Sequence, residues 1–336
     1  MRTISVVALM LVAAIPAWAA DLPDTTAVGA LRADAKALKP PVESDAARAF
    51  LDATATLPDP GWRTLYYDSS RTHYWSDATV ASVDEAARAK LITRRLDDHF
   101  YYNTRYGSPL AYARPIDLLA RAGMKDWSKA RFVDFGYGTI GHLRLLASLG
   151  ADAVGIEVDP LLPVLYGQPG DQGEIPSHGG KLTLVDGHFP AGDGVAEKVG
   201  GGYDLFISKN TLKHGYIHPS RPAEPRMLVH LGVDDTAFVR AVHALLKPRG
   251  LAMIYNLSPA PDPPDKPYRP WTDGHDPFPR DVWEKAGFEV IAYDKVDDDA
   301  ARAMGHALGW DQGGEGAMDL KNDLFAHYTI VRKKAK

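Results

Sequence analysis

"RFVDFGYGTIGHL", residues 131–143, contains an apolar strand, a glycine-rich turn and the first turn of a helix. Glycines let a ligand approach the backbone closely, and the N-terminus of a helix directs N–H groups at the polar end of that ligand. An acidic residue, Glu157, ends the next expected strand, 21 residues after Gly136. A carboxylate there can accept hydrogen bonds from both hydroxyl groups of a ribose. The stretch therefore predicts a site for a nucleoside-containing ligand rather than a turn that only joins strand to helix.

Strands and helices alternate after this stretch. The pattern predicts strands at 130–135, 152–158, 181–186, 203–208 and 250–258, with helices at 141–150 and 234–247. Such alternation is typical of a mostly parallel sheet that helices cover on both faces. We expect the last two strands, 289–296 and 324–333, to close the sheet as an antiparallel pair. The proline-rich stretch 259–279 is predicted to be a long loop in which Trp271 and His275 form one wall of the site.

Residues 21–125 are expected to form a small helical region in front of the sheet, which would occupy 126–336. Helices are predicted at 44–57, 82–99 and 115–122, and Ser82 and Glu85 have the spacing of a capping box. An aromatic segment follows the second helix, with two possible roles. It either packs at the join or covers the ligand and grips an acceptor through Tyr101, Tyr102, Arg105 and Tyr106.

The first twenty residues resemble an export signal. They hold a positive charge at Arg2, an apolar run at 4–15, and small residues at Ala17 and Ala19. The pattern predicts a cleaved signal peptide at 1–20 and a periplasmic or secreted protein. The alternative is an uncleaved membrane anchor, but the apolar run is shorter than the roughly 20 residues that span a bilayer.

Composition excludes several classes of chemistry. The chain of 336 residues has no cysteine, which rules out disulfides, zinc–thiolate sites, iron–sulfur clusters and thiol nucleophiles. Its formal net charge is −5. With no block of lysines or arginines, we expect no nucleic-acid partner.

Asp134 separates two kinds of nucleotide ligand. Dinucleotide-binding folds usually place an apolar residue two positions before the first glycine, whereas a carboxylate suits a ligand with a cationic end. From this residue on, the chain resembles the class I S-adenosylmethionine-dependent methyltransferases, whose first motif is an acid followed by G-x-G. The resemblance covers about 126–336 and includes "VGIEVDP", "LVDGHFP", "YDLFISKNTLKH" and "LLKPRGLAMIY".

The resemblance implies a Rossmann-like fold, α/β with a mostly parallel seven-stranded sheet and an antiparallel closing strand. It implies S-adenosylmethionine as the cofactor and a set of cofactor-binding residues: Asp134, Gly136, Gly138, Glu157, Asp186, Gly187 and His188. In this set Asp186 would meet the adenine amino group, and His188 or Phe189 would flank the ring. The chain departs from the family pattern at Gly141, one place late, and at 208–211, which lack the N/D-P-P-Y motif.

Residues that follow the fourth strand are candidates for catalysis, because ligands in such sheets bind beyond the carboxyl ends of the strands. They are Asn210, Lys213, His214, Tyr216 and His218. His214 is the first candidate for a general base, since histidine titrates near neutral pH; it could equally be a loop residue. His214 and His218 also have a helical metal-ligand spacing, but Gly215 and Pro219 disfavour a helix and no third ligand is evident, so no metal is expected.

The predicted function is methyl transfer from S-adenosylmethionine to an oxygen or nitrogen of a small-molecule or protein acceptor, with His214, Asn210 and Tyr102 as candidate catalytic residues. Two alternatives stay open. One is an exported protein that binds an adenosyl ligand without turnover. The other is a nicotinamide-dependent oxidoreductase, which the glycine spacing alone would also fit. No stable membrane insertion is expected after signal cleavage.

Overall fold

A computed structural model describes residues 25–103, 107–176, 178–314 and 316–335. The predicted signal peptide, residues 1–20, and the candidate lid residues Arg105 and Tyr106 lie outside these ranges. Among the described residues no helix is long and apolar enough to cross a membrane.

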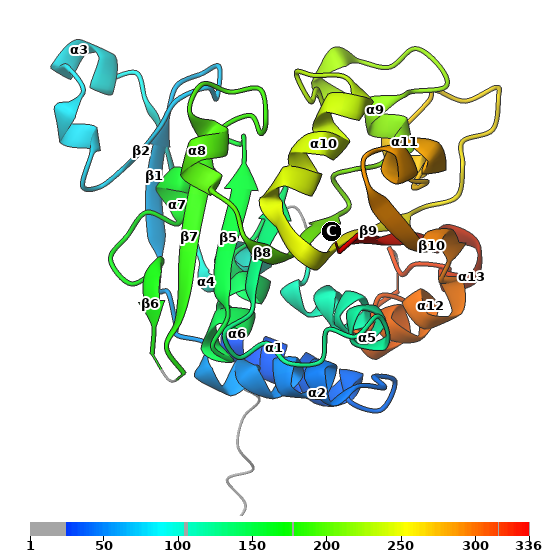
Figure 1. Ribbon diagram of the computed structural model, residues 1–336. Helices are drawn as coiled ribbons and strands as arrows, with labels where there is room; N and C mark the ends of the chain where they lie inside the picture. The colour runs from blue at the N-terminus through cyan, green and yellow to red at the C-terminus, as the bar shows by residue number, and fades with distance from the viewer. Residues whose placement is uncertain (1–24, 104–106, 177, 315, 336) are drawn as a thin grey trace, which may run out of the picture.

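One sheet dominates the fold (Figure 1). Its strands lie in the order β10-β11-β9-β8-β4-β5-β7-β6. The neighbours from β9 to β7 run parallel, whereas β11 runs antiparallel to both β9 and β10. The predicted parallel sheet and its antiparallel closure are therefore confirmed. The bounds are β4 (Arg131–Phe135), β5 (Asp152–Glu157), β6 (Gly173–Ile175), β7 (Gly180–Asp186), β8 (Tyr203–Lys209), β9 (Leu246–Ser258), β10 (Phe288–Val296) and β11 (Phe325–Lys333).

The described sheet has eight strands, not the predicted seven. The additional strand, β6, is only three residues long and pairs antiparallel with β7 at the edge. Its sequence, Gly-Glu-Ile, is too short to show a period-two pattern, which is why the sequence did not indicate it.

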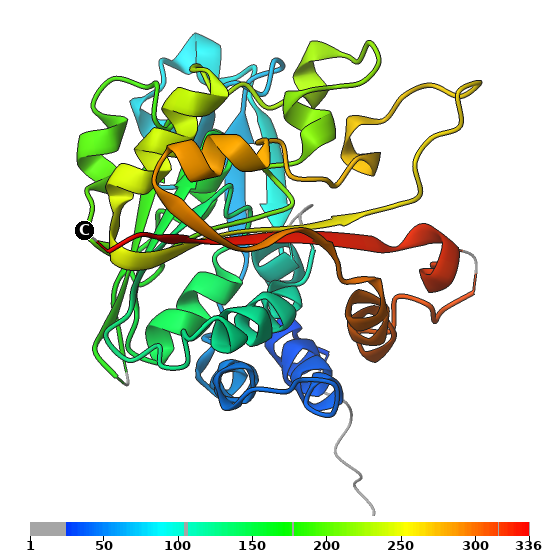
Figure 2. The same cartoon turned by 45° about the vertical axis from the view of Figure 1, so that its right-hand side comes forward.

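Helices cover both faces of the sheet, as Figures 1 and 2 show. Alternate side chains of β8 divide between two cores, with Leu205 and Ile207 in one and Phe206 in the other. The first core holds α5 (Ala113–Arg121), α6 (Gly141–Ser148) and α12 (Asp298–Ala307), and the second holds α8 (Val195–Val199), α10 (Asp235–Leu245) and α11 (Arg280–Lys285). Short helices lie at α7 (Leu162–Leu165), α9 (His214–Ile217) and α13 (Leu320–Asp323).

The N-terminal region is not purely helical. Helices α1 (Ala27–Leu38) and α2 (Asp45–Asp52) pack below the main sheet, and a separate antiparallel sheet follows in the order β2-β1-β3. Its strands are β1 (Arg63–Tyr67), β2 (Tyr74–Ser76) and β3 (Ile92–Leu96). The predicted helices near 44–57 and 115–122 are present as α2 and α5.

The predicted helix at 82–99 is wrong. This segment contains only the short helix α3 (Glu85–Arg88), then β3, then α4 (Asp98–Asn103). Asp84, not Ser82, caps α3 by accepting a hydrogen bond from the N–H of Ala87. The β-branched pair Ile92 and Thr93 favours a strand, and every residue of β3 pairs with β1.

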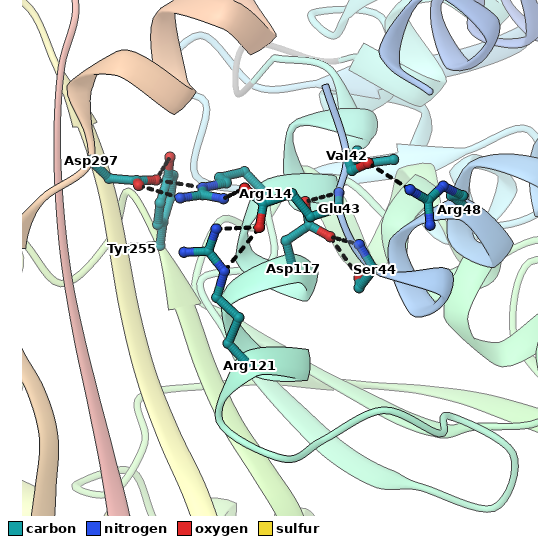
Figure 3. A network of polar contacts seen from close by, with 9 residues as sticks. All are labelled: Val42, Glu43, Ser44, Arg48, Arg114, Asp117, Arg121, Tyr255 and Asp297. Atoms are coloured by element: carbon teal, nitrogen blue, oxygen red, sulfur yellow. Dashed lines mark hydrogen bonds and ion pairs between the residues drawn. The ribbon is translucent and has the colours of Figure 1, made fainter. Parts of the chain in front are cut away.

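A polar network anchors α5 between the N-terminal helices and the closing part of the sheet (Figure 3). Arg114 donates two hydrogen bonds to the carboxylate of Asp297, at 2.6 and 2.8 Å, and the hydroxyl of Tyr255 donates a third at 3.2 Å. One turn further along α5, Asp117 accepts hydrogen bonds from the backbone and hydroxyl of Ser44, the N-cap of α2. The network ties residues that lie far apart in the sequence.

Candidate functional site

A cavity of about 1260 Å³ lies at the carboxyl ends of the parallel strands. Strand β4 is the point at which the chain order reverses, since β5 and β7 follow on one side of it and β8 and β9 on the other. Open α/β sheets bind their ligands at this position. The segments that follow β4, β5, β7, β8 and β9 all contribute to the wall, and β1, β2 and β3 cover it from the N-terminal region.

The glycine turn after β4 forms part of the wall, and two of its glycines are sterically required. Gly136 has φ +79°, and a Cβ there would lie 2.1 Å from Oγ1 of Thr211. Gly141 begins α6, where a Cβ would lie 2.7 Å from Cβ of Pro109. The late third glycine therefore serves the close packing of α6 against the segment before β4.

Glu157 stands at the end of β5, beside the glycine turn and on the cavity wall. Its carboxylate accepts hydrogen bonds from the backbone N–H groups of Gly138, Val158 and Asp159. Burial nevertheless raises the pKa of Glu157 to about 7. Gly138 itself is outside the wall, so it contributes by holding this carboxylate.

Asp134 is fully buried and does not reach the cavity, contrary to the expectation that it meets the cationic end of a ligand. Its Oδ2 accepts hydrogen bonds from the hydroxyl of Tyr112, at 2.7 Å, and from Nε2 of His142, at 2.5 Å. The Tyr112 and His142 rings stack with centroids 3.7 Å apart. Because Tyr112 does line the cavity, Asp134 acts on the site through this ring.

The segment after β7 provides the adjoining wall through Gly187, His188 and Phe189. Asp186 pairs in register with Glu157 at the ends of their strands, but its side chain is exposed and lies outside the wall. Partial desolvation by the surrounding protein raises the pKa of the Asp186 carboxyl group.

Two buried lysines lie at the end of β8 and just after it. Lys209 ends the strand and Lys213 follows it, and both line the cavity while remaining 9% and 4% exposed. Lys213 donates hydrogen bonds to the carbonyl groups of Leu257 and Trp271, at 2.5 and 3.2 Å. Burial, together with the neighbouring charge of Lys209, lowers the pKa of Lys213 to about 7.

Asn210 is also on the cavity wall, in a left-handed conformation with φ +66°. Its side-chain oxygen accepts a hydrogen bond from the N–H of Leu257 at 2.7 Å, which joins the ends of β8 and β9. Tyr216 and Trp271 line the same region, as the sequence indicated.

Two predicted catalytic residues do not line the cavity. Nδ1 of His214 lies 2.9 Å from Oδ2 of Asp273, and this contact raises the pKa of His214. Tyr102 is fully buried, with its hydroxyl donating to the carbonyl of Pro58. His275 is likewise absent from the wall and contacts Asp294.

The centroid of the His218 ring lies 5.8 Å from that of the His214 ring, but each histidine pairs with a different carboxylate, His218 with Asp235 and His214 with Asp273. Over the described ranges, no group of three or more histidine, aspartate or glutamate side chains is arranged to hold a metal ion.

Sequence reasoning missed the contribution of the N-terminal sheet. Tyr67, Arg71, Tyr74 and Arg94 come from β1–β3 and the turns beside them, and all four line the cavity. The aromatic residues of "RTLYY" and "YWS" favour strands and could have indicated this sheet. Their meeting with the main sheet depends on tertiary packing that no local pattern encodes.

Neither protein-family models nor curated proteins give a match to this chain. Solved structures with a similar fold include several S-adenosylmethionine-dependent methyltransferases. One is an S-adenosylmethionine-dependent methyltransferase of Mesorhizobium loti, at 16% identity and a TM-score of 0.37, covering 66% of this chain and 98% of that one.

Two further structures have comparable values. The magnesium protoporphyrin IX methyltransferase of Synechocystis, solved with bound S-adenosylmethionine, is 14% identical with a TM-score of 0.33, over 65% of this chain and 74% of its own. A cyclopropane synthase of Mycobacterium tuberculosis is 11% identical with a TM-score of 0.40, and the match covers 66% of this chain and 85% of the synthase.

Proposed function

We propose that this protein binds S-adenosylmethionine in the cavity and transfers its methyl group to an oxygen or nitrogen of an acceptor. The observation that carries the proposal is the Glu157 carboxylate at the reversal point of the sheet, held by the N–H of Gly138 in the glycine turn and by the N–H groups of Val158 and Asp159. A carboxylate there accepts hydrogen bonds from both ribose hydroxyls. The wall at 187–189 then adjoins the position of the base.

When bound, S-adenosylmethionine supplies an electrophilic methyl group. The chain's own residues orient the acceptor and remove its proton, which requires a group within reach of the acceptor atom. Lys213 is our candidate for this base, because it lines the cavity and its pKa of about 7 leaves a large neutral fraction near neutral pH. Its two carbonyl contacts use two N–H bonds of the neutral amine and leave the lone pair free.

Replacing Glu157 with alanine is expected to weaken binding of S-adenosylhomocysteine by about 1.5–3 kcal/mol, the typical cost of hydrogen bonds to a charged group. The Glu157→Gln variant should also bind S-adenosylhomocysteine more weakly than the wild type, but less weakly than Glu157→Ala. Since the pKa of Glu157 is about 7, the wild-type affinity should rise as the pH increases through this value and the carboxylate ionises. Isothermal titration calorimetry at a series of pH values measures both effects.

The control is Glu174→Ala, which removes an exposed carboxylate from β6 and should leave binding unchanged. Tighter binding of NAD than of S-adenosylhomocysteine would favour the oxidoreductase alternative. Binding without transfer of labelled methyl groups to any component of a metabolite extract would favour the non-catalytic alternative.

We also propose that the chain is exported, on the pattern of residues 1–20 and the polar "DLPDTT" that follows. The expected mature chain begins at Ala20 or Asp21. Cell fractionation followed by N-terminal sequencing measures this directly. Intact Met1 on protein recovered from the cytoplasm would contradict export while leaving the ligand proposal untouched.

A further inference from the structure

Charge is distributed unevenly around the cavity. The acidic wall residues, Glu157 and Asp159, lie together at and just after the end of β5, where the ribose would bind. The basic side chains lie elsewhere on the wall and are Arg71, Arg94, Lys209, Lys213 and Arg226. Away from the end of β5, the described wall of the cavity therefore carries lysines and arginines but no aspartate or glutamate.

Lys209 is the most informative of these cations. Its side chain is 9% exposed, and within the described part of the chain its ammonium group makes no hydrogen bond and no ion pair. Its Nζ lies 5.5 Å from the centroid of the Tyr112 ring. Burial lowers the pKa of Lys209 only to about 8, because the charge of Asp134 opposes the effect, so the group is mostly charged near neutral pH. Lys209 lines the cavity, so its unpartnered ammonium is available to an anionic ligand that enters it.

Two arginines extend the positive surface to the mouth of the cavity. Arg71 contacts the ring of Tyr67 and Arg94 the ring of Phe100, with 5.9 and 4.8 Å to the ring centroids. Neither guanidinium has a carboxylate partner among the described residues, and both side chains are exposed. Exposed cations at the entrance of a cleft attract anions and raise their association rate.

Aromatic side chains line the same part of the cavity. The rings of Tyr67 and Tyr74 lie 5.6 Å apart, and Trp271 and Tyr216 contribute from the segments after β9 and β8. Such surfaces favour a flat apolar body over a small hydrated ion.

We infer that the acceptor is an anionic molecule with an aromatic body, whose negative group binds the ammonium of Lys209 while the arginines of β1–β3 attract it to the mouth. The inference deepens the proposed function by naming the class of acceptor. That the bound anion is methylated rests on the proposed function, whereas the binding of the anion does not.

Benzoate is a suitable probe, and benzamide is its uncharged counterpart. Titrations at constant ionic strength, with S-adenosylhomocysteine present at saturation, should show benzoate binding at least tenfold more tightly than benzamide. Lys209→Met should reduce benzoate affinity at least tenfold, as loss of a charge-assisted hydrogen bond does, and leave benzamide unaffected. Lys285→Met, which removes an exposed lysine paired with Asp281, is the matched control and should change neither.

Equal affinity for the two probes, or an unchanged benzoate affinity in Lys209→Met, would overturn the inference. Displacement of benzoate by S-adenosylhomocysteine would also overturn it, because Lys209 would then serve the cofactor. If Lys209→Met does not fold, the exposed pair Arg71→Met/Arg94→Met replaces it, with an expected severalfold loss of benzoate affinity that shrinks at high salt. Benzoate binding without any binding of S-adenosylhomocysteine would refute the proposed function and leave the anion site standing.

Discussion

Asp134→Ala is expected to lower the free energy of unfolding by about 2–6 kcal/mol. The substitution leaves the hydroxyl of Tyr112 and Nε2 of His142 without their acceptor, and each such buried group costs ~1–3 kcal/mol. Both partners of Asp134 are buried, so water does not replace the lost contacts. Urea-induced unfolding monitored by circular dichroism measures the change.

Asp134→Asn keeps the shape of the side chain and one acceptor oxygen, so it should lower the free energy of unfolding by less than Asp134→Ala does. The matched control is Asp281→Ala, which removes an exposed carboxylate from an i,i+4 pair and should change stability by less than about 0.5 kcal/mol. A double-mutant cycle between Asp134→Ala and His142→Ala should show strong coupling. An Asp134→Ala protein as stable as the wild type would show that this carboxylate does not support the wall of the cavity.

Replacing Lys213 with methionine is expected to slow methyl transfer by about a hundredfold or more, the usual contribution of a general base. The measurement uses methyl-labelled S-adenosylmethionine and the acceptor that an extract screen identifies. If neutral Lys213 is the reactive form, kcat/KM of the wild type should increase as the pH rises through about 7, the pKa of this amine.

Lys213→Arg separates catalysis from structure. Arginine can still donate hydrogen bonds to the carbonyl groups of Leu257 and Trp271, but it stays protonated and cannot act as a base. The arginine variant should therefore be as slow as the methionine variant. Full activity in Lys213→Arg would make the lysine a structural link between two loops. His214→Ala, a change outside the cavity wall, is expected to alter kcat/KM by only a few fold.

The main sheet could be predicted because each of its parallel strands contains a mainly apolar run bounded by turn residues. The positions of Gly136, Glu157, Gly187, His188 and Asn210 on the cavity wall follow from the same topology, since strand ends meet at one edge. The positions at which the predicted strands end thus indicate which residues share a site.

Other features depend on contacts that a linear pattern does not contain. Asp134 has the right spacing to face a ligand, yet the stacked rings of Tyr112 and His142 enclose it. Tyr102 lies in an aromatic segment that looks like a lid, but its hydroxyl bonds Pro58 in the interior. Arg71 and Arg94 join Lys209 on the cavity wall only when the segment that contains β1–β3 folds over the ends of the main strands.

The contact between Arg114 and Asp297 has a consequence for how the chain is made. The two residues are 183 positions apart, and α1 also packs against α12. Chains leave the ribosome N-terminus first, so the first helices emerge long before the elements that complete their packing. Closing so long a loop adds little to the entropic cost, but contacts of this range slow folding. Final compaction of the earliest-synthesised helices therefore waits for translation to reach the far end of the chain.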